Sequence, residues 1–158
     1  MLFDQRKIKA ILCLFCGTGG LFAAEVLEVT QERVNDLPGG KEADGIIGDF
    51  LLRSDKVEAV ISHKAPLRRA NMSTFYGKGG ITPGCLYDLT LRDSDNDQIT
   101  ILAPLDQRGN VSYVRVVPAE EVAANEAAVD TVVSAAMNKG LYKRYRYIVT
   151  DGIQGVTI

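Results

Sequence analysis

The sequence has one histidine, three cysteines and no apolar run long enough to cross a bilayer comfortably. The single histidine, His63, excludes zinc sites built on two or three histidines of this chain. A Ser-His-Asp triad could use only His63, and the chain has no G-x-S-x-G nucleophile motif. We interpret His63 as a surface residue at the end of a strand. The sequence therefore contains no recognisable catalytic constellation.

Residues 1–24 have the pattern of a secretory signal peptide. Three basic residues precede the uncharged apolar run AILCLFCGTGGLFAA, and the acidic stretch EVLEV follows it. We predict cleavage after Ala23 or after Ala24, and export to the periplasm or the extracellular space. The residue three positions before the cut would be Leu21 or Phe22, where a small side chain is preferred. The alternative is that the segment stays on the chain as an uncleaved anchor.

Residues 25–158 are enough for a single domain with a core of its own. Two of the three cysteines leave with the signal peptide, so Cys85 has no partner for an intrachain disulfide. Cys85 begins an apolar stretch, and we interpret it as a small core residue. Residues 1–24 hold three of the 18 basic and one of the 20 acidic residues, so the remainder has a formal charge of −4. That charge gives no support to nucleic-acid binding.

Short stretches of alternating or β-branched residues predict a mostly β fold with little helix. We expect strands within 25–34, 49–52, 56–62, 85–92, 98–104, 111–118, 129–134, 140–150 and the end of 151–158. The turn-forming RSD predicts a β-hairpin between the second and third of these strands, and the three strands from 85 to 118 predict an antiparallel meander. The alanine- and glutamate-rich stretch before residue 129 favours a helical or irregular start. These features indicate an antiparallel sandwich or supersandwich.

The last residues, DGIQGVTI, read as a turn followed by the first half of a strand. The sequence stops at Ile158 within an apolar β pattern, without a polar tail. We expect an incomplete domain at the front of a longer polypeptide. The alternative is a last strand that is paired within a sheet.

Three aspartates at alternate positions, Asp93, Asp95 and Asp97, have the spacing that opens a calcium-binding EF loop. That loop also needs glycine at its sixth position and glutamate at its twelfth, which are Gln98 and Pro104 here. We therefore interpret the stretch as a polar turn between two strands. A looser calcium site on the three aspartates is the alternative, and no other cofactor is predicted.

Residues 63–84 form a long stretch without periodicity, and such loops in small domains are often functional. Arg68, Arg69, Phe75 and Tyr76 gather basic and aromatic groups in this stretch. Such groups can stack on and hydrogen-bond a sugar, or contact another domain. The alternative is a loop that covers one end of a sheet.

A second group of the same chemistry lies along the predicted strand 140–150. Tyr142, Arg144 and Arg146 alternate there and so share one face. This face either binds a ligand or is solvated, with long side-chain stems covering apolar surface.

The order of these signals resembles the opening of the galactose-mutarotase-like β-supersandwich. The likeness rests on GDFLLRSDKVEAVI, on a Gly-Gly turn and on CLYDLTLRDSDNDQITILAP, while GLYKRYRYIVTDGIQGVTI is similar to that fold's later pair of long strands. The same order resembles the β-rich N-terminal region of large exported bacterial proteins that carry a metal-dependent hydrolase domain further on. The epimerases of the superfamily use histidines and a carboxylate on the sugar, and this chain lacks that motif. The resemblance thus implies a sandwich module that faces sugar, and no catalytic residue.

We predict an exported, non-catalytic β-sandwich module, the N-terminal part of a larger protein, with a binding or scaffolding role. The expected partners are a carbohydrate or a downstream domain of the same polypeptide, with no nucleic acid and no membrane beyond the signal segment. One alternative is the N-terminal fragment of a secreted hydrolase or sugar-active enzyme whose catalytic residues lie beyond residue 158. Another is a self-contained β domain stabilised by calcium.

Overall fold

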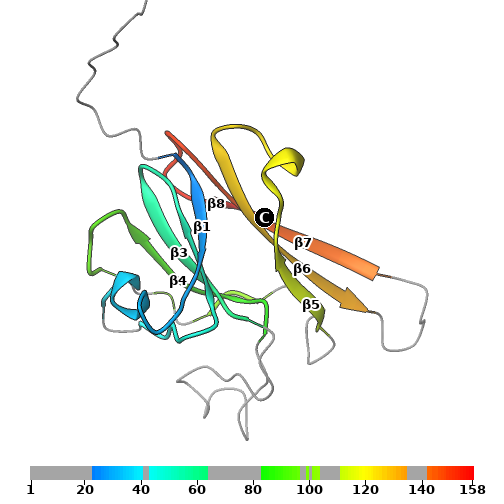
Figure 1. The fold of residues 1–158 in the computed structure, drawn as a ribbon, viewed down its shortest axis with the longest axis horizontal. Helices are drawn as coiled ribbons and strands as arrows, with labels where there is room; N and C mark the ends of the chain where they lie inside the picture. Colours follow the sequence, from blue (N-terminus) through cyan, green and yellow to red (C-terminus); the bar gives the residue numbers. More distant parts are fainter. Residues whose placement is uncertain are drawn as a thin grey trace, which may run out of the picture.

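A computed structural model of the chain describes residues 23–40, 43–63, 83–96, 99, 101–103, 111–134 and 142–158, and shows two four-stranded antiparallel sheets (Figure 1). The first sheet consists of β1 (Glu25–Glu28), β2 (Phe50–Arg53), β3 (Val57–Ile61) and β4 (Leu86–Leu91), in that order. The second consists of β5 (Val111–Val116), β6 (Glu126–Ser134), β7 (Tyr142–Thr150) and β8 (Val156–Thr157). Two single 3₁₀ turns, η1 (Val34–Asp36) and η2 (Ala119–Glu121), are the helical elements of this part of the chain. The prediction of a mostly β, sandwich-type fold with little helix is confirmed.

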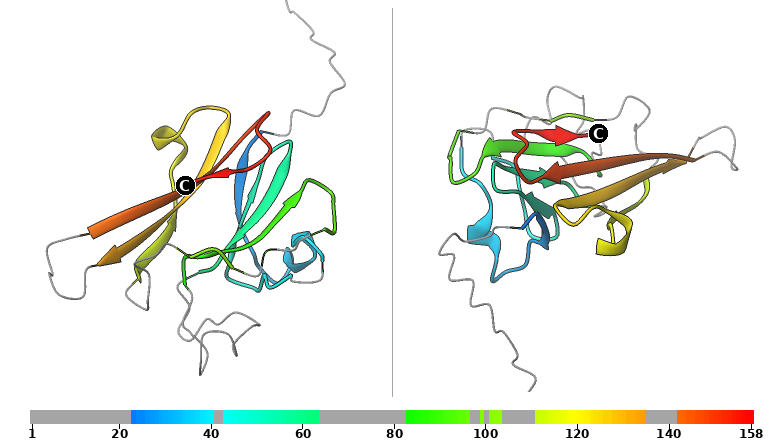
Figure 2. Two further views of the ribbon diagram at one scale, coloured as in Figure 1. Left: turned by 180° about the vertical axis from the view of Figure 1, so that it is seen from behind. Right: turned by 90° about the horizontal axis from the view of Figure 1, so that it is seen from above.

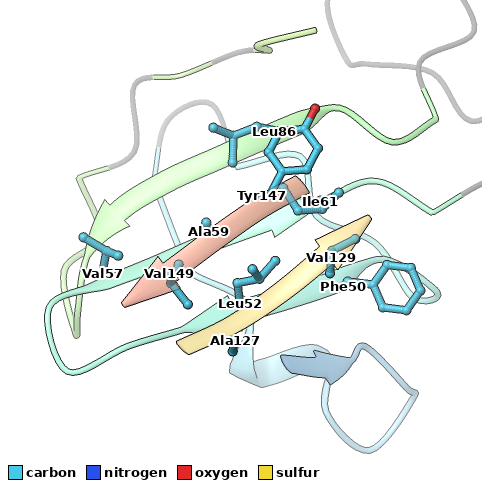
Figure 3. Close-up of a cluster of buried hydrophobic side chains, with 10 residues drawn as sticks. All are labelled: Phe50, Leu52, Val57, Ala59, Ile61, Leu86, Ala127, Val129, Tyr147 and Val149. Carbon is cyan, nitrogen blue, oxygen red and sulfur yellow. The ribbon is translucent and has the colours of Figure 1, made fainter. Parts of the chain in front are cut away.

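The hydrophobic core lies where β6 and β7 cross β2, β3 and β4 (Figure 3). Each of these strands alternates its side chains, so every second residue points between the sheets. The core residues are Phe50, Leu52, Val57, Ala59, Ile61, Leu86, Ala127, Val129, Tyr147 and Val149, all at most 6% exposed. The first sheet packs against only part of the second. The C-terminal end of β6 and the N-terminal end of β7 extend beyond the first sheet (Figures 1 and 2).

Two buried hydroxyl groups tie the β3–β4 connection to the second sheet. The Tyr147 hydroxyl and Thr131 Oγ1 both donate to the backbone carbonyl of Gly84, at 2.9 and 3.0 Å. Gly84 has φ +66, and a Cβ placed there would lie 2.5 Å from Thr131 Cγ2. Only glycine therefore fits this position without displacing its neighbour. Cys85, the next residue, is 1% exposed, which confirms it as a core residue.

The segment between β1 and β2 covers the outer face of the first sheet. Val29 packs there with Leu51 and Val60 in a second apolar cluster. The fully buried Asp88 carboxylate on β4 accepts hydrogen bonds from the backbone nitrogens of Asp44 and Gly45, at 3.2–3.3 Å. A buried carboxylate needs hydrogen-bond donors, and these backbone nitrogens supply them. Asp88 thus anchors the covering segment to the sheet.

The predicted hairpin is confirmed as β2 and β3, with Phe50 paired to Ile61. Its turn is closed by Ser54, whose Oγ accepts from the backbone nitrogens of Lys56 and Val57 at 3.2 Å. This serine turn is the chemistry that the RSD stretch predicted.

The predicted meander from residue 85 to residue 118 is wrong, because β4 lies in the first sheet and β5 in the second. Of the expected strand 98–104, the described residues make a single bridge, between Leu102 and Leu86. Turn residues predict where a chain reverses, but they do not specify which sheet the next strand joins.

The expected strand at residue 129 begins earlier, at Glu126. Ala127 and Ala128 favour helix by propensity, yet both are buried in the middle of the sheet. Packing against the core overrides their weak local preference. The last residues do form a strand, β8, and it pairs with β7 through Ile148 and Val149.

Candidate functional site

Charged and aromatic side chains gather on the outer face of β5, β6 and β7. We call this surface the arginine–tyrosine face. It comprises Tyr113, Arg115, Glu121, Asp130, Tyr142, Arg144 and Arg146. The alternation of the strands places these strand residues away from the core, since the neighbouring Val129 and Tyr147 point into it. The predicted shared face of Tyr142, Arg144 and Arg146 is thus confirmed as an outward face.

Asp130 is the central residue of the face. Its side chain is fully buried, and in the sheet register it lies between Arg115 on β5 and Arg146 on β7. Arg146 binds it with two hydrogen bonds, Nε to Oδ1 at 2.7 Å and Nη2 to Oδ2 at 3.0 Å. Arg115 Nη2 adds a third, to Oδ2 at 3.1 Å. Two guanidinium groups on different strands are thereby held to one carboxylate.

These contacts keep Asp130 ionised. Burial by itself favours the neutral acid, but the hydrogen bonds and charge of Arg146, then the hydrogen bond of Arg115 and the charge of Arg144, outweigh it. The net result is that the pKa of Asp130 lies below its ordinary value. The carboxylate is therefore a fixed negative charge at neutral pH, and the two arginines stay paired with it.

Glu121, in η2, closes the network from above the sheet. Its Oε2 accepts from Arg115 Nη2 and from Arg146 Nη2, both at 3.2 Å. The Arg146 Nη1 also donates to the Glu121 backbone carbonyl at 3.2 Å. These bonds fold the β5–β6 connection back over one half of the face. The other half, toward the end of β6, is not covered by any described residue of this connection, and we call it the open half.

The open half combines two tyrosines with one arginine. Tyr113 on β5 and Tyr142 on β7 are 45% and 63% exposed, and Arg144, two residues from Tyr142 on β7, is exposed as well. Val132 lies in register between Tyr113 and Arg144 and is nevertheless buried. Its burial indicates that the long neighbouring side chains cover it, as the apolar stems of arginine and tyrosine do. Both phenol rings and one guanidinium group remain available to a ligand.

The chemistry of the exposed groups on this face suits binding. Its exposed groups are phenols and guanidinium ions, which donate hydrogen bonds, stack on ring faces and bind carboxylates. His63 follows the end of β3, where its ring lies 5.6 Å from that of Phe50. The described ranges of the chain contain no group of three His, Cys, Asp or Glu residues that could hold a metal ion.

In the aspartate stretch, the chain turns at Arg92 and Asp93 after β4, and residues 94–96 are irregular. Asp93 has φ +56 and is exposed, and its carboxylate lies 3.7 Å from Arg92 Nε. Asp95 is also exposed and lies against Gly39 of the covering segment. Asp97 lies outside the described residues, so the calcium site on the three aspartates stays a prediction.

Two further predictions concern residues outside the described part. The expected ligand-binding residues Arg68, Arg69, Phe75 and Tyr76 all belong to the stretch 64–82 that is not described. Residues 1–22 of the expected signal peptide are likewise not described. The described residues form no helix long and apolar enough to cross a membrane.

A pocket of about 220 Å³ lies at another position, between the start of β3, the end of β4 with the residues that follow it, and the β7–β8 turn. Its wall includes Val57, Thr90, Leu91, Asn96 and Gln154. None of the residues that line it is ionisable. Pockets that bind drug-sized ligands hold roughly 300–1,000 Å³, so this one is small for such a ligand. We therefore place the candidate site on the arginine–tyrosine face.

Sequence reasoning identified the β7 half of this face and missed its other half. Tyr113 and Arg115 alternate within VSYVRV just as Tyr142 and Arg144 do in their strand. Asp130 had a signal as well, because it is the one charge within the apolar stretch AVDTVVS. A lone acid in a buried strand needs a cationic partner. The two arginine-bearing strands could have supplied it.

The chain matches no family model, no curated protein and no solved structure. The function proposed below therefore rests on the residues of the arginine–tyrosine face and their geometry.

Proposed function

We propose that this protein is an exported, non-catalytic β-sandwich module that binds carbohydrate through the arginine–tyrosine face. The observation that supports the proposal is the Asp130 carboxylate, which holds Arg115 and Arg146 in place beside two exposed tyrosines. Surface arginines and tyrosines with fixed positions lose little conformational entropy on binding. Such residues are over-represented in binding surfaces.

The size of the open half suits an extended ligand. Tyr113 and Arg144 lie in one row across three strands, which separates their Cα atoms by about 10 Å. Tyr142 lies two residues from Arg144 on the same strand, about 7 Å along it. The rings can stack on the apolar faces of sugar rings, and the polar groups can bond to hydroxyls. A chain of several sugars can contact all three residues.

The charge of the face favours acidic sugars. Three arginines face the two acids Asp130 and Glu121, so the face has an excess of one positive charge. The charge of Arg144 helps to lower the pKa of Asp130, and its exposed planar group can bind a carboxylate with two hydrogen bonds. We therefore expect carboxylate-bearing polysaccharides to bind more tightly than neutral ones, and the difference to shrink as salt is added.

A glycan array followed by calorimetric titration tests the proposal. Binding of an acidic oligosaccharide should weaken about tenfold or more in Tyr113→Ala and in Tyr142→Ala, because each stacked ring contributes on the order of 1–2 kcal/mol. Arg144→Ala should weaken binding and reduce its salt dependence. The matched control is Arg33→Ala, an exposed arginine beside η1 in the segment that covers the first sheet, and it should bind normally.

The proposal fails if no carbohydrate on the array binds, or if the Arg33 variant loses as much affinity as the Arg144 variant. Binding that survives in all three variants of the face would place the carbohydrate site elsewhere on the chain.

A further inference from the structure

Three segments that are far apart in the sequence meet at one end of the sandwich: the start of β1, the β2–β3 turn and the β7–β8 turn (Figure 2). Asp151 links them. Its Oδ2 accepts a hydrogen bond from the backbone nitrogen of Ala24 at 3.0 Å, and its Oδ1 accepts from the nitrogen of Asp55 at 3.1 Å. In return, Asp55 Oδ1 accepts from the nitrogen of Gly152 at 2.6 Å.

Ala24 is the first residue that this arrangement holds. It is partly buried and packs against the core cluster, whereas Ala23 is exposed. The peptide bond between the two alanines therefore joins an exposed residue to one that belongs to the fold. A cut after Ala23 leaves Ala24 in place, with its nitrogen as the new terminus. A cut after Ala24 removes both its packing and the donor that Asp151 binds.

We propose that a leader peptidase hydrolyses the Ala23–Ala24 peptide bond and that Asp151 then binds the new terminal ammonium group of Ala24. One water is consumed. Its oxygen completes the carboxyl group of Ala23, and the nitrogen of Ala24 becomes an amine that takes up a proton from solvent. The inference rests on the export step of the proposed function, and it selects one of the two cleavage points that the sequence leaves open.

Cleavage at this bond strengthens an existing contact. Before the cut, Asp151 accepts from a neutral backbone N–H; afterwards it faces an ammonium group at the same nitrogen position. Charge-assisted hydrogen bonds are roughly twice as strong as neutral ones. The β1 end and the β7–β8 turn are thereby joined by an ion pair between residues 127 apart in sequence.

The first test is the mass of the exported protein. The chain with residues 1–24 is produced in a bacterial host, and the exported fraction is analysed by intact mass and N-terminal sequencing. We expect a chain that begins with Ala24. An exported chain that begins with Glu25, or that keeps its first 23 residues, overturns the inference but leaves the binding proposal intact. A chain that is never exported overturns the export step itself, and loss of glycan binding alone would affect only the arginine–tyrosine face.

The second test uses the pH dependence of stability in the processed protein. Asp151 should raise the pKa of the terminal ammonium above its ordinary value of about 7.7–8.0. Its stabilisation is then complete below pH 7 and is lost as the pH rises through the folded-state value. Asp151→Asn should accordingly lower Tm by about 3–6 °C at pH 6, and by less than half of that at pH 9.5.

The other charges at this end of the sandwich supply the control. Asp55 and Lys56 form an ion pair with an Nζ–Oδ2 distance of 2.9 Å, and Glu25 follows Ala24 in β1. Asp55→Asn weakens the contact with Gly152, which involves no terminal amine, so its Tm change should be equal at pH 6 and pH 9.5. An Asp151→Asn loss that is also equal at both pH values overturns the inference.

Discussion

Replacing Asp130 by alanine should destabilise the protein more than any other change within the arginine–tyrosine face. The side chain of Asp130 is fully buried, and the substitution leaves Arg115 and Arg146 without the carboxylate that holds both. Breaking a fully buried ion pair costs about 3–5 kcal/mol. Because both guanidinium groups can still reach Glu121 and solvent, we expect the lower end of that range, about 3 kcal/mol.

This loss should be readily measured. At about 2.1 cal/mol/K per residue, the unfolding entropy of a domain of this size is on the order of 0.3 kcal/mol/K, so Tm should fall by about 10 °C. Urea denaturation should give the same free-energy difference at an unchanged m-value. Glu121→Ala is the matched control, since it contacts the same two arginines from an exposed position. Exposed ion pairs contribute about 1 kcal/mol or less.

The pH dependence provides an independent check. Because the pKa of Asp130 is lowered in the folded state, its stabilisation is present above the unfolded value of about 3.9 and is lost as the pH falls through the folded value. The stability difference between the wild type and Asp130→Asn should therefore be constant from pH 5 to 7 and should shrink below about pH 4. A loss under 1 kcal/mol in Asp130→Ala, or an equal loss in Glu121→Ala, would refute the assignment of Asp130 as the central residue.

Two further predictions concern the contacts of Gly84. Tyr147→Phe should cost about 1 kcal/mol in urea denaturation, because the Gly84 carbonyl keeps the Thr131 hydroxyl as a donor. The double variant Tyr147→Phe/Thr131→Val should lose more stability than the two single variants together, because the buried Gly84 carbonyl then has neither hydroxyl donor. Losses that simply add would show that the two hydroxyl groups do not substitute for each other. Gly84→Ala should cost about 3 kcal/mol, because it combines positive φ with a Cβ 2.5 Å from Thr131. Gly48 also has a positive φ, +96, but a Cβ there would meet no other atom within 4 Å, so Gly48→Ala should cost only about 1 kcal/mol. Equal losses in the two variants would show that the contact between a Cβ at position 84 and Thr131 does not affect stability.

The strands were the predictable part of this fold. The alternation in VEAVI and in YKRYRYIVT predicts which side chains face the core, and the structure has β3 and β7 at these stretches with that alternation. The start of β6 was not predictable from local preference, because its alanines favour helix, and it is the packing of Ala127 against the first sheet that holds this segment as a strand. Assignment of β4 and β5 to different sheets depends on long-range contacts, which no local pattern contains.

The candidate site was predictable only in part for the same reason. Alternation placed Tyr142, Arg144 and Arg146 on one face, as the structure shows. The grouping of Arg115, Asp130 and Arg146 depends on the register of three strands, and residues 15 and 16 apart meet there. A register shift of one residue would turn Asp130 toward the core. The sequence therefore indicates that this acid needs a partner, but not which arginine supplies it.

Three carboxylates that are at least partly buried have one shared role in the described part of the molecule. Asp88 holds the covering segment, Asp151 joins the start of β1 to the β2–β3 turn, and Asp130 holds two arginines. Each accepts two or more hydrogen bonds, so each fixes several donors at once. On the arginine–tyrosine face this has a consequence for binding. Arg115 and Arg146 are already ordered before a ligand arrives, so their conformational entropy is not lost in the complex. Asp130 is then a positioning residue for the proposed ligand, although it is too deeply buried to touch it.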